Sequence, residues 1–198
     1  MYLQEETSSV TIIEKSRFIC YLKRVSNEEE YRDYLNRIRK KHHDATHVCS
    51  AVICHGMQRS SDDGEPSGTA GVPILNVLQK NHLDETCALV VRYFGGIKLG
   101  AGGLIRAYGN AVSECLKHAR FVESRIYPKY ALKLSYEAAN RIDHYLRSQT
   151  MLLDVSYDTE VTYRFALDDP QKLEKIKEYS KDILPIQIGE ETIEKVVE

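Results

Sequence analysis

One segment, residues 90–109, constrains the fold of this chain more than any other. It reads VVRYFGGIKLGAGGLIRAYG and holds six of the eleven glycines. The apolar run Cys87–Val91 leads into it, and the apolar-periodic segment Leu104–Ala119 follows. A short apolar run bounded by glycine is typical of a buried strand, and a 3.6-residue apolar period is typical of a helix. The segment therefore predicts a strand, a glycine-rich connection and a helix.

Three cations, Arg92, Lys98 and Arg106, are interleaved with these glycines. Glycine lets the backbone take positive φ and approach a ligand closely. The first turn of a helix presents unpaired N–H groups and the positive end of its dipole, which favours anions. We therefore expect a small concavity that accepts negative charge. Its candidate anion- or nucleic-acid-binding residues are Arg92, Tyr93, Gly95, Gly96, Lys98, Gly100, Gly102, Gly103 and Arg106.

Known phosphate-binding loops do not match this segment. Ala101 stands where a P-loop needs lysine, and no GxGxxG follows the strand. Tight packing of a strand against a helix, which needs small residues, explains the glycines equally well. The three cations tilt the interpretation towards binding, because positive charge around bare amides needs a partner.

A second glycine-rich stretch, Gly56–Gly71, is predicted to be a loop throughout. It carries the acidic residues Asp62, Asp63 and Glu65. These carboxylates could be a solvated surface, could hold Mg²⁺, or could fold over the nearby cations and neutralise them when no ligand is bound. The sequence leaves the three interpretations open.

A secondary basic patch ends the first predicted helix, for which Ser26 is the expected N-cap. Basic residues at a helix C-terminus usually match the dipole and face solvent, and contact with RNA is the alternative. The patch consists of Arg37, Arg39, Lys40 and Lys41.

Composition indicates a globular protein, with 42% apolar and 28% charged residues. The net charge of −2 excludes a global attraction to nucleic acid, so any basic surface must be local. Five cysteines with no CxxC pair are typical of reduced, buried thiols. His47, Cys49, Cys54 and His55 are metal ligands by type, but strand alternation separates them. We therefore expect no metal site and no cofactor.

Targeting signals are not evident. The N-terminus MYLQEETSSV lacks the basic and apolar regions of a signal peptide, and no apolar run approaches the roughly 20 residues of a membrane span. The expectation is a cytoplasmic protein without a membrane partner.

The pattern of predicted elements restarts after residue 120, and the second half reads in the order βαββαβ, which is typical of a ferredoxin-like domain. The sequence thus predicts an α+β protein with two domains, residues 1–124 and 125–198.

Two stretches together resemble the YigZ/IMPACT family. They are SDDGEPSGTAGVPIL at residues 61–75 and LVVRYFGGIKLGAGGLIRAYG at residues 89–109, with Ser16-Arg17-Phe18 and His47-Val48-Cys49-Ser50-Ala51 also similar. The resemblance covers essentially the whole chain. It implies a first domain like the second domain of a small-subunit ribosomal protein, and a second like the C-terminal domains of elongation factor G. Eukaryotic members restrain a translation kinase but lack this second domain, so that role transfers poorly.

Two classes of function follow. The first is a non-enzymatic binding protein linked to translation or its regulation, whose partner is RNA, the ribosome or a protein of the translation machinery. The second is a nucleotide- or phosphate-binding enzyme related to galactokinase-type kinases, although Gly100–Leu104 lacks their serines. Because no serine or cysteine stands beside a plausible histidine and aspartate, binding is favoured over catalysis. No catalytic residue can be named, and the oligomeric state is not indicated.

Overall fold

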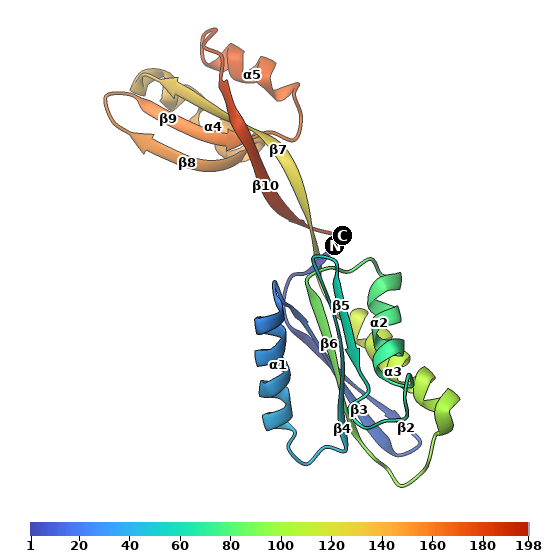
Figure 1. Ribbon diagram of the computed structural model, residues 1–198. Helices are drawn as coiled ribbons and strands as arrows, with labels where there is room; N and C mark the ends of the chain where they lie inside the picture. The colour runs from blue at the N-terminus through green and yellow to red at the C-terminus, as the bar shows by residue number, and fades with distance from the viewer. Residues whose placement is uncertain (198) are drawn as a thin grey trace. The chain divides into compact units, whose positions relative to one another are not determined.

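A computed structural model describes residues 1–197. The chain forms two compact units, which are described separately here (Figure 1). Unit 1 contains Met1–Glu123 together with Val196 and Val197, and unit 2 contains Ser124–Lys195. Among the described residues, no helix is long and apolar enough to cross a bilayer.

Unit 1 is built on a five-stranded antiparallel sheet whose strand order is β2-β3-β6-β4-β5. Helix α1 covers one face of this sheet, and α2 and α3 cover the other (Figure 1). A short strand β1 (Tyr2–Leu3) pairs with the start of β7 (Phe121–Leu134). The elements are β2 (Thr7–Ile13), β3 (Ser16–Arg24), α1 (Glu28–Lys41), β4 (His47–Cys54), β5 (Met57–Ser61), α2 (Gly71–Lys80), β6 (Thr86–Tyr93) and α3 (Gly100–Leu116).

The central strands of unit 1 are buried on both faces. Along β4, Val48 and Val52 pack towards α1, whereas Cys49 and Ala51 belong to the core under α2 and α3. Strand β6 divides in the same way between the two cores. Because helices cover both faces, these strands read as continuous apolar runs rather than alternating ones.

The prediction of a loop throughout residues 56–71 is wrong for its first part. Met57–Ser61 forms the edge strand β5, which pairs with β4 through a two-residue turn at His55 and Gly56. Both turn residues have positive φ, +47° and +83°, as a type I′ hairpin turn requires. An edge strand keeps polar side chains in solvent, so its sequence resembles a loop.

Two helix boundaries also differ from the prediction. Helix α3 begins at Gly100, four residues before Leu104, so Gly102 and Gly103 lie inside its first turns. The N-cap of α1 is Asn27, whose side chain accepts from the N–H of Glu30, rather than Ser26. Glycine and polar residues near the start of a helix show no apolar periodicity, so the sequence pattern does not reveal where the first turn begins.

Unit 2 has the βαββαβ order predicted from the sequence. Its strand order, β10-β7-β9-β8, is that of a ferredoxin-like sheet. Its core gathers Leu132 and Leu134 of the first strand, Ile142 and Leu146 of the first helix, and Phe165 of the third strand. The elements are β7 (Phe121–Leu134), α4 (Tyr136–Gln149), β8 (Met151–Tyr157), β9 (Val161–Ala166), α5 (Lys172–Tyr179) and β10 (Ile186–Val196). The α+β class is confirmed.

Candidate functional site

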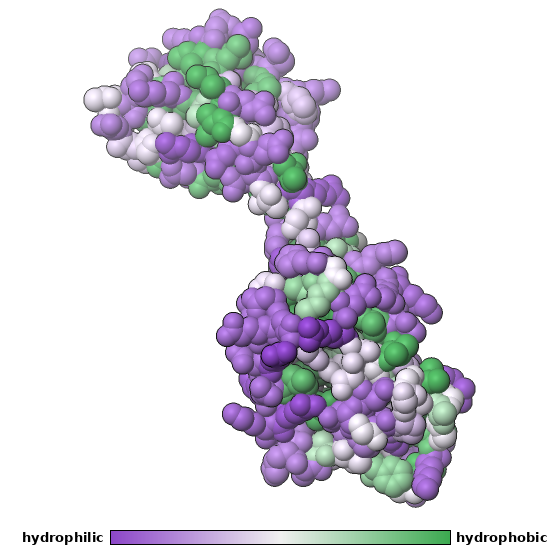
Figure 2. Space-filling view, viewed as in Figure 1, coloured by the Kyte–Doolittle hydropathy of each residue, from purple (hydrophilic) through white to green (hydrophobic). Residues whose placement is uncertain are grey.

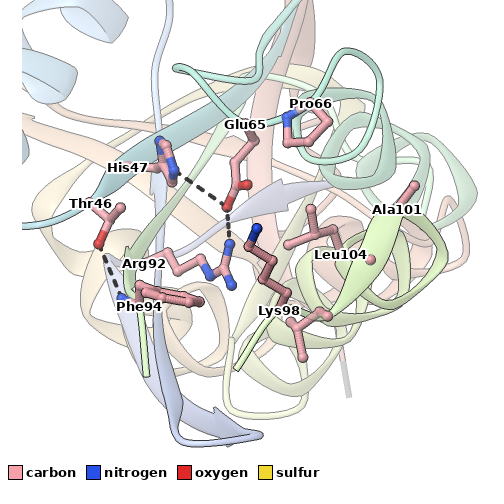
Figure 3. Close-up of a pocket in the computed structure, with 11 residues that line it drawn as sticks. Thr46, His47, Glu65, Pro66, Arg92, Phe94, Lys98, Ala101 and Leu104 are labelled. Atoms are coloured by element: carbon pink, nitrogen blue, oxygen red, sulfur yellow. Dashed lines mark hydrogen bonds and ion pairs between the residues drawn. The ribbon is translucent and has the colours of Figure 1, made fainter. Parts of the chain in front are cut away.

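A hollow of about 380 Å³ lies in unit 1 where β6 ends and α3 begins (Figure 3). Its walls come from the start of β4, the loop before α2, the end of β6 and the first turn of α3. The side chains of His47, Glu65, Arg92 and Lys98 bring polar groups to one region of it (Figure 3). The lining residues are Thr46, His47, Glu65, Pro66, Arg92, Phe94, Lys98, Leu99, Gly100, Ala101 and Leu104.

A buried ion pair forms one wall of this hollow. The Nη1 of Arg92 donates to Oε1 of Glu65 at 2.6 Å, and the two side chains are 6% and 4% exposed. The Nη2 of Arg92 donates to the hydroxyl of Ser16 at 3.4 Å. Its Nε is buried and has no hydrogen-bond partner among the described residues. The charge of Arg92 is therefore already compensated, although its donors are not all used.

Tyr108 of α3 connects the ion pair to the buried core through hydrogen bonds. Its hydroxyl donates to Oε1 of Glu65 at 2.8 Å and accepts from the thiol of Cys49 at 3.3 Å. Burial, followed by the neighbouring Cys49 and Glu65, raises the pKa of Tyr108 well above its ordinary value. Burial likewise raises the pKa of Cys49 to about 12. Cys49 is thus a thiol at neutral pH and a poor nucleophile.

His47 is fixed in one tautomer by the acidic loop. Its Nδ1 lies 2.7 Å from the backbone carbonyl of Asp63, which can only accept, so Nδ1 carries the hydrogen. Its Nε2 lies 3.9 Å from Oε1 of Glu65. Gly64 between the two acids has φ +87°, and a Cβ there would lie 3.4 Å from the imidazole. The ring and the loop therefore position each other.

The three acids of the loop have different roles. Glu65 pairs with Arg92, and Asp63 accepts from the N–H of Val48 and from Arg39, both at 2.7 Å. Asp62 instead accepts backbone N–H groups of Gly68, Ala70 and Gly71 at 2.8–3.0 Å, which caps the start of α2. Burial alone would raise the pKa of Asp62, but these backbone hydrogen bonds hold it below its ordinary value.

The glycines between β6 and α3 have separate structural causes. A Cβ at Gly95 would lie 2.1 Å from the backbone of Lys15, so the chain can pass there only as glycine. Gly96 and Gly100 have φ of +88° and +69°, a conformation that favours glycine. At Gly103 a Cβ would lie 2.9 Å from the Cβ of Leu99. Tight packing therefore accounts for Gly95 and Gly103.

The three predicted cations do not all line the same hollow. Lys98 lines the hollow beside Arg92, whereas Arg106 lines a second one of about 770 Å³, which also includes Lys98 and Gly103. Neither hollow is lined by all three cations, so the convergence of Arg106 with Arg92 and Lys98 stays a prediction. Lys98 and Arg106 are exposed, and within residues 1–197 neither has an ion-pair partner.

The secondary basic patch is half neutralised. Arg37 pairs with Glu6 and Arg39 pairs with Asp63, each at 2.7 Å. Lys40 is exposed, and the ammonium of Lys41 lies 4.9 Å from the ring centre of Tyr21.

Tyr93 belongs to a separate hydrogen-bonded chain rather than to the hollow. Its hydroxyl donates to Asp44 at 3.1 Å and lies 2.9 Å from Nδ1 of His42. The Nε2 of His42 lies 2.8 Å from the hydroxyl of Tyr21. Because the single hydroxyl hydrogen of Tyr93 goes to Asp44, neutral His42 donates from Nδ1 and accepts from Tyr21.

Several lining residues were not identified from the sequence. His47 was considered as a metal ligand by type, and Thr46 and Phe94 were not singled out, nor was Tyr108, which hydrogen-bonds to Glu65 behind the lining. The pairing of β4 with β6 places His47 directly opposite Arg92. A correct strand register would have brought the two side chains to the same face, but register is not readable from either strand alone.

Apolar side chains surround the start of α3. Phe94, Ile97 and Ile105 are 47%, 39% and 45% exposed. The face of unit 1 in Figure 2 is mostly hydrophilic, and apolar residues reach the surface at the end where Figure 1 shows α3 beginning. Exposed apolar groups beside unpaired cations are a combination suited to binding.

The fold and site define a class: a two-unit α+β protein with a glycine-rich, partly apolar hollow beside exposed cations. The sequence model of one protein family, the Impact N-terminal domain, matches residues 14–116, which is about half of the chain. This range includes every residue that lines the hollow. The chain belongs to the IMPACT family.

Relatives in two bacteria extend the similarity over most of the chain. The chain is 48% identical over 164 residues to the IMPACT family member YvyE of Bacillus subtilis, covering 81% of this chain and 76% of YvyE. It is 34% identical over 194 residues to the IMPACT family member YigZ of Escherichia coli, covering 92% and 95%. A crystal structure described as that of a hypothetical protein superposes with a TM-score of 0.59 at 31% identity, covering 94% and 96%.

Proposed function

We propose that this protein is a non-enzymatic binding protein that acts in translation or its regulation and contacts RNA, on its own or within the ribosome, through the start of α3. One observation carries the proposal. Lys98 and Arg106 are exposed and have no ion-pair partner among residues 1–197, whereas Arg92, Arg37 and Arg39 are each neutralised by a carboxylate. Uncompensated cations are the groups that displace counterions from a phosphate backbone.

The translational setting draws on the family resemblance and not on the geometry. The folds that this resemblance implies for the two domains recur in ribosome-associated proteins. A ferredoxin-like unit 2 is compatible with that setting but does not by itself indicate a function.

A paired charge variant tests the RNA contact. In Lys98→Gln/Arg106→Gln, affinity for a structured RNA falls on the order of tenfold at 0.1 M salt. The magnitude of the negative slope of log K against log salt falls by about 1.4 if the two cations contact single-stranded segments of that RNA. The control is Lys80→Gln/Arg120→Gln, which removes the same charge from two exposed residues, the last residue of α2 and the residue that precedes β7. Equal affinity of the two double variants would contradict the proposal.

Co-sedimentation tests the translational setting. The wild-type chain is expected to sediment with ribosomal particles in a salt-sensitive way, and the Lys98→Gln/Arg106→Gln variant to remain in the supernatant. RNA binding in isolation with no sedimentation at any salt concentration would restrict the proposal to free RNA.

A nucleotide-binding enzyme is the second candidate, favoured by the hollow of about 380 Å³ beside Arg92 and Lys98. Calorimetry with ATP and Mg²⁺, together with a phosphate-release assay, separates it from the first. Binding with release of phosphate would support the enzyme.

A further inference from the structure

The hollow bounded by β4, β6 and α3 has a wall chemistry that points to one class of ligand. Its volume of about 380 Å³ lies within the range of about 300–1,000 Å³ that is usual for small-ligand sites. Pro66, Phe94, Leu99 and Leu104 give it apolar surface, and its polar groups are few and close together (Figure 3). Such sites hold the body of a ligand by apolar contact and orient it with a few polar groups.

The polar groups that remain unused are mainly donors. Glu65 already accepts from Arg92 and Tyr108. By contrast, the Nε of Arg92 is buried without a partner, and the ammonium of Lys98 has no carboxylate within ion-pair distance among residues 1–197. In the part of the chain that the structure describes, no side chain caps the first turn of α3. An orphaned buried donor requires an acceptor, so the ligand carries an anionic or strongly accepting group.

The wall also offers an aromatic surface and one acceptor. The ring of Phe94 is 47% exposed, and the Cζ of Arg92 lies 5.4 Å from its centre. The Nδ1 of His47 is used by the carbonyl of Asp63, so in the tautomer with its hydrogen on Nδ1 the Nε2 atom is the acceptor that His47 brings to the lining beside Arg92. A flat ring stacks on Phe94, and a hydroxyl or amino group donates to His47.

Anion, flat ring and hydroxyl occur together in a nucleotide. We propose that the hollow binds one nucleoside monophosphate unit, with the base against Phe94 and the phosphate held by Lys98 and the first turn of α3. The unit is either a free nucleotide or the phosphorylated end of a single RNA strand. The strand form rests on the proposed RNA-binding function, whereas the free form stands without it.

Equilibrium dialysis with AMP and UMP, using adenosine as the phosphate-free probe, tests the site. Phe94→Ala is expected to weaken nucleotide binding roughly tenfold, as the loss of stacking on one base does. Lys98→Gln is expected to weaken binding of AMP but not of adenosine. Phe94 is half exposed and Lys98 is on the surface, so both variants should fold, which the amide exchange of β6 verifies. Lys80→Gln is the matched control.

The source of the nucleotide is separated with a short single-stranded RNA carrying either a 5′-phosphate or a 5′-hydroxyl. Preference for the phosphorylated strand, lost in Phe94→Ala, supports the strand form. Binding of AMP without binding of any strand supports the free form and contradicts the proposed RNA function. Strand binding that falls in Lys98→Gln/Arg106→Gln but not in Phe94→Ala overturns the nucleotide site and leaves RNA binding standing. If the wild-type chain binds neither the mononucleotides nor either strand at millimolar concentration, the nucleotide site is overturned, and the assay with structured RNA decides the proposed function separately.

Discussion

The buried ion pair between Glu65 and Arg92 makes the stability of unit 1 sensitive to a single substitution. Glu65→Ala leaves a guanidinium that is 6% exposed without its carboxylate. Breaking a buried pair by removing one partner costs about 3–5 kcal/mol, because an uncompensated charge remains buried. The direct attraction has a similar size, about 4 kcal/mol for charges 4 Å apart at an effective dielectric constant of 20. The hydrogen bond from Tyr108 is lost as well.

Urea unfolding measures this cost. With a slope of about 2 kcal/mol per molar, a loss of about 4 kcal/mol lowers the midpoint by about 2 M. Far-UV circular dichroism follows the transition, and amide exchange of β6 confirms that it belongs to unit 1. The loss should be nearly the same at 0.1 and 1 M salt, because a buried pair is poorly screened. Arg37→Ala, which removes an exposed pair, serves as the control and should cost at most about 1 kcal/mol.

A double-mutant cycle decides whether the pair itself is responsible. Arg92→Met combined with Glu65→Ala removes both charges, and we expect the double variant to lose at least about 2 kcal/mol less than the sum of the single losses. A loss below about 1 kcal/mol in Glu65→Ala, or additive losses in the cycle, would refute the reasoning and show that the charges do not depend on each other.

Three further predictions concern local structure. Gly95→Ala should destabilise unit 1 by more than about 3 kcal/mol, because its Cβ would lie 2.1 Å from the backbone of Lys15. Gly102→Ala should instead stabilise α3 by about 0.5 kcal/mol, because its Cβ would meet only the tip of the Arg106 side chain, at 3.6 Å. Thermal unfolding compares the two variants. Because the folded pKa of Asp62 is depressed, its charge stabilises the fold fully above pH 3.8, and this stabilisation is lost as the pH falls from 3.8 through the lower folded value. In acid-titrated unfolding curves, the difference in stability between wild type and Asp62→Asn should therefore shrink below pH 3.8 and vanish only below the folded pKa. Burial raises the pKa of both Cys49 and Cys87 to about 12, so a thiol-specific reagent at pH 8 should leave them unmodified in the native protein and label all five cysteines in denaturant.

The site shows where sequence reasoning ends. The glycine-rich segment indicated the strand, the connection and the helix, because apolar period and glycine are local signals. The edge strand Met57–Ser61 was not predicted, because its polar side chains show no apolar pattern. Its pairing with β4 is a feature of the tertiary structure. The sequence likewise did not show which of the cations are buried and which are exposed. Arg92 and Lys98 belong to the same glycine-rich segment, yet one is buried and the other is exposed.

The sequence by itself determined the α+β class, the βαββαβ order of unit 2, the acidic loop before α2 and the glycine-rich connection between β6 and α3. Periodicity and turn chemistry act over a few residues, so they can be read along the chain. Only the tertiary structure decided that Glu65 neutralises Arg92 from 27 positions away and that His47 lies opposite Arg92 on the neighbouring strand. It also decided that Lys98 has no ion-pair partner within the described residues 1–197. Ion pairing depends on distances of a few ångströms between groups far apart in sequence, and strand register and burial set those distances.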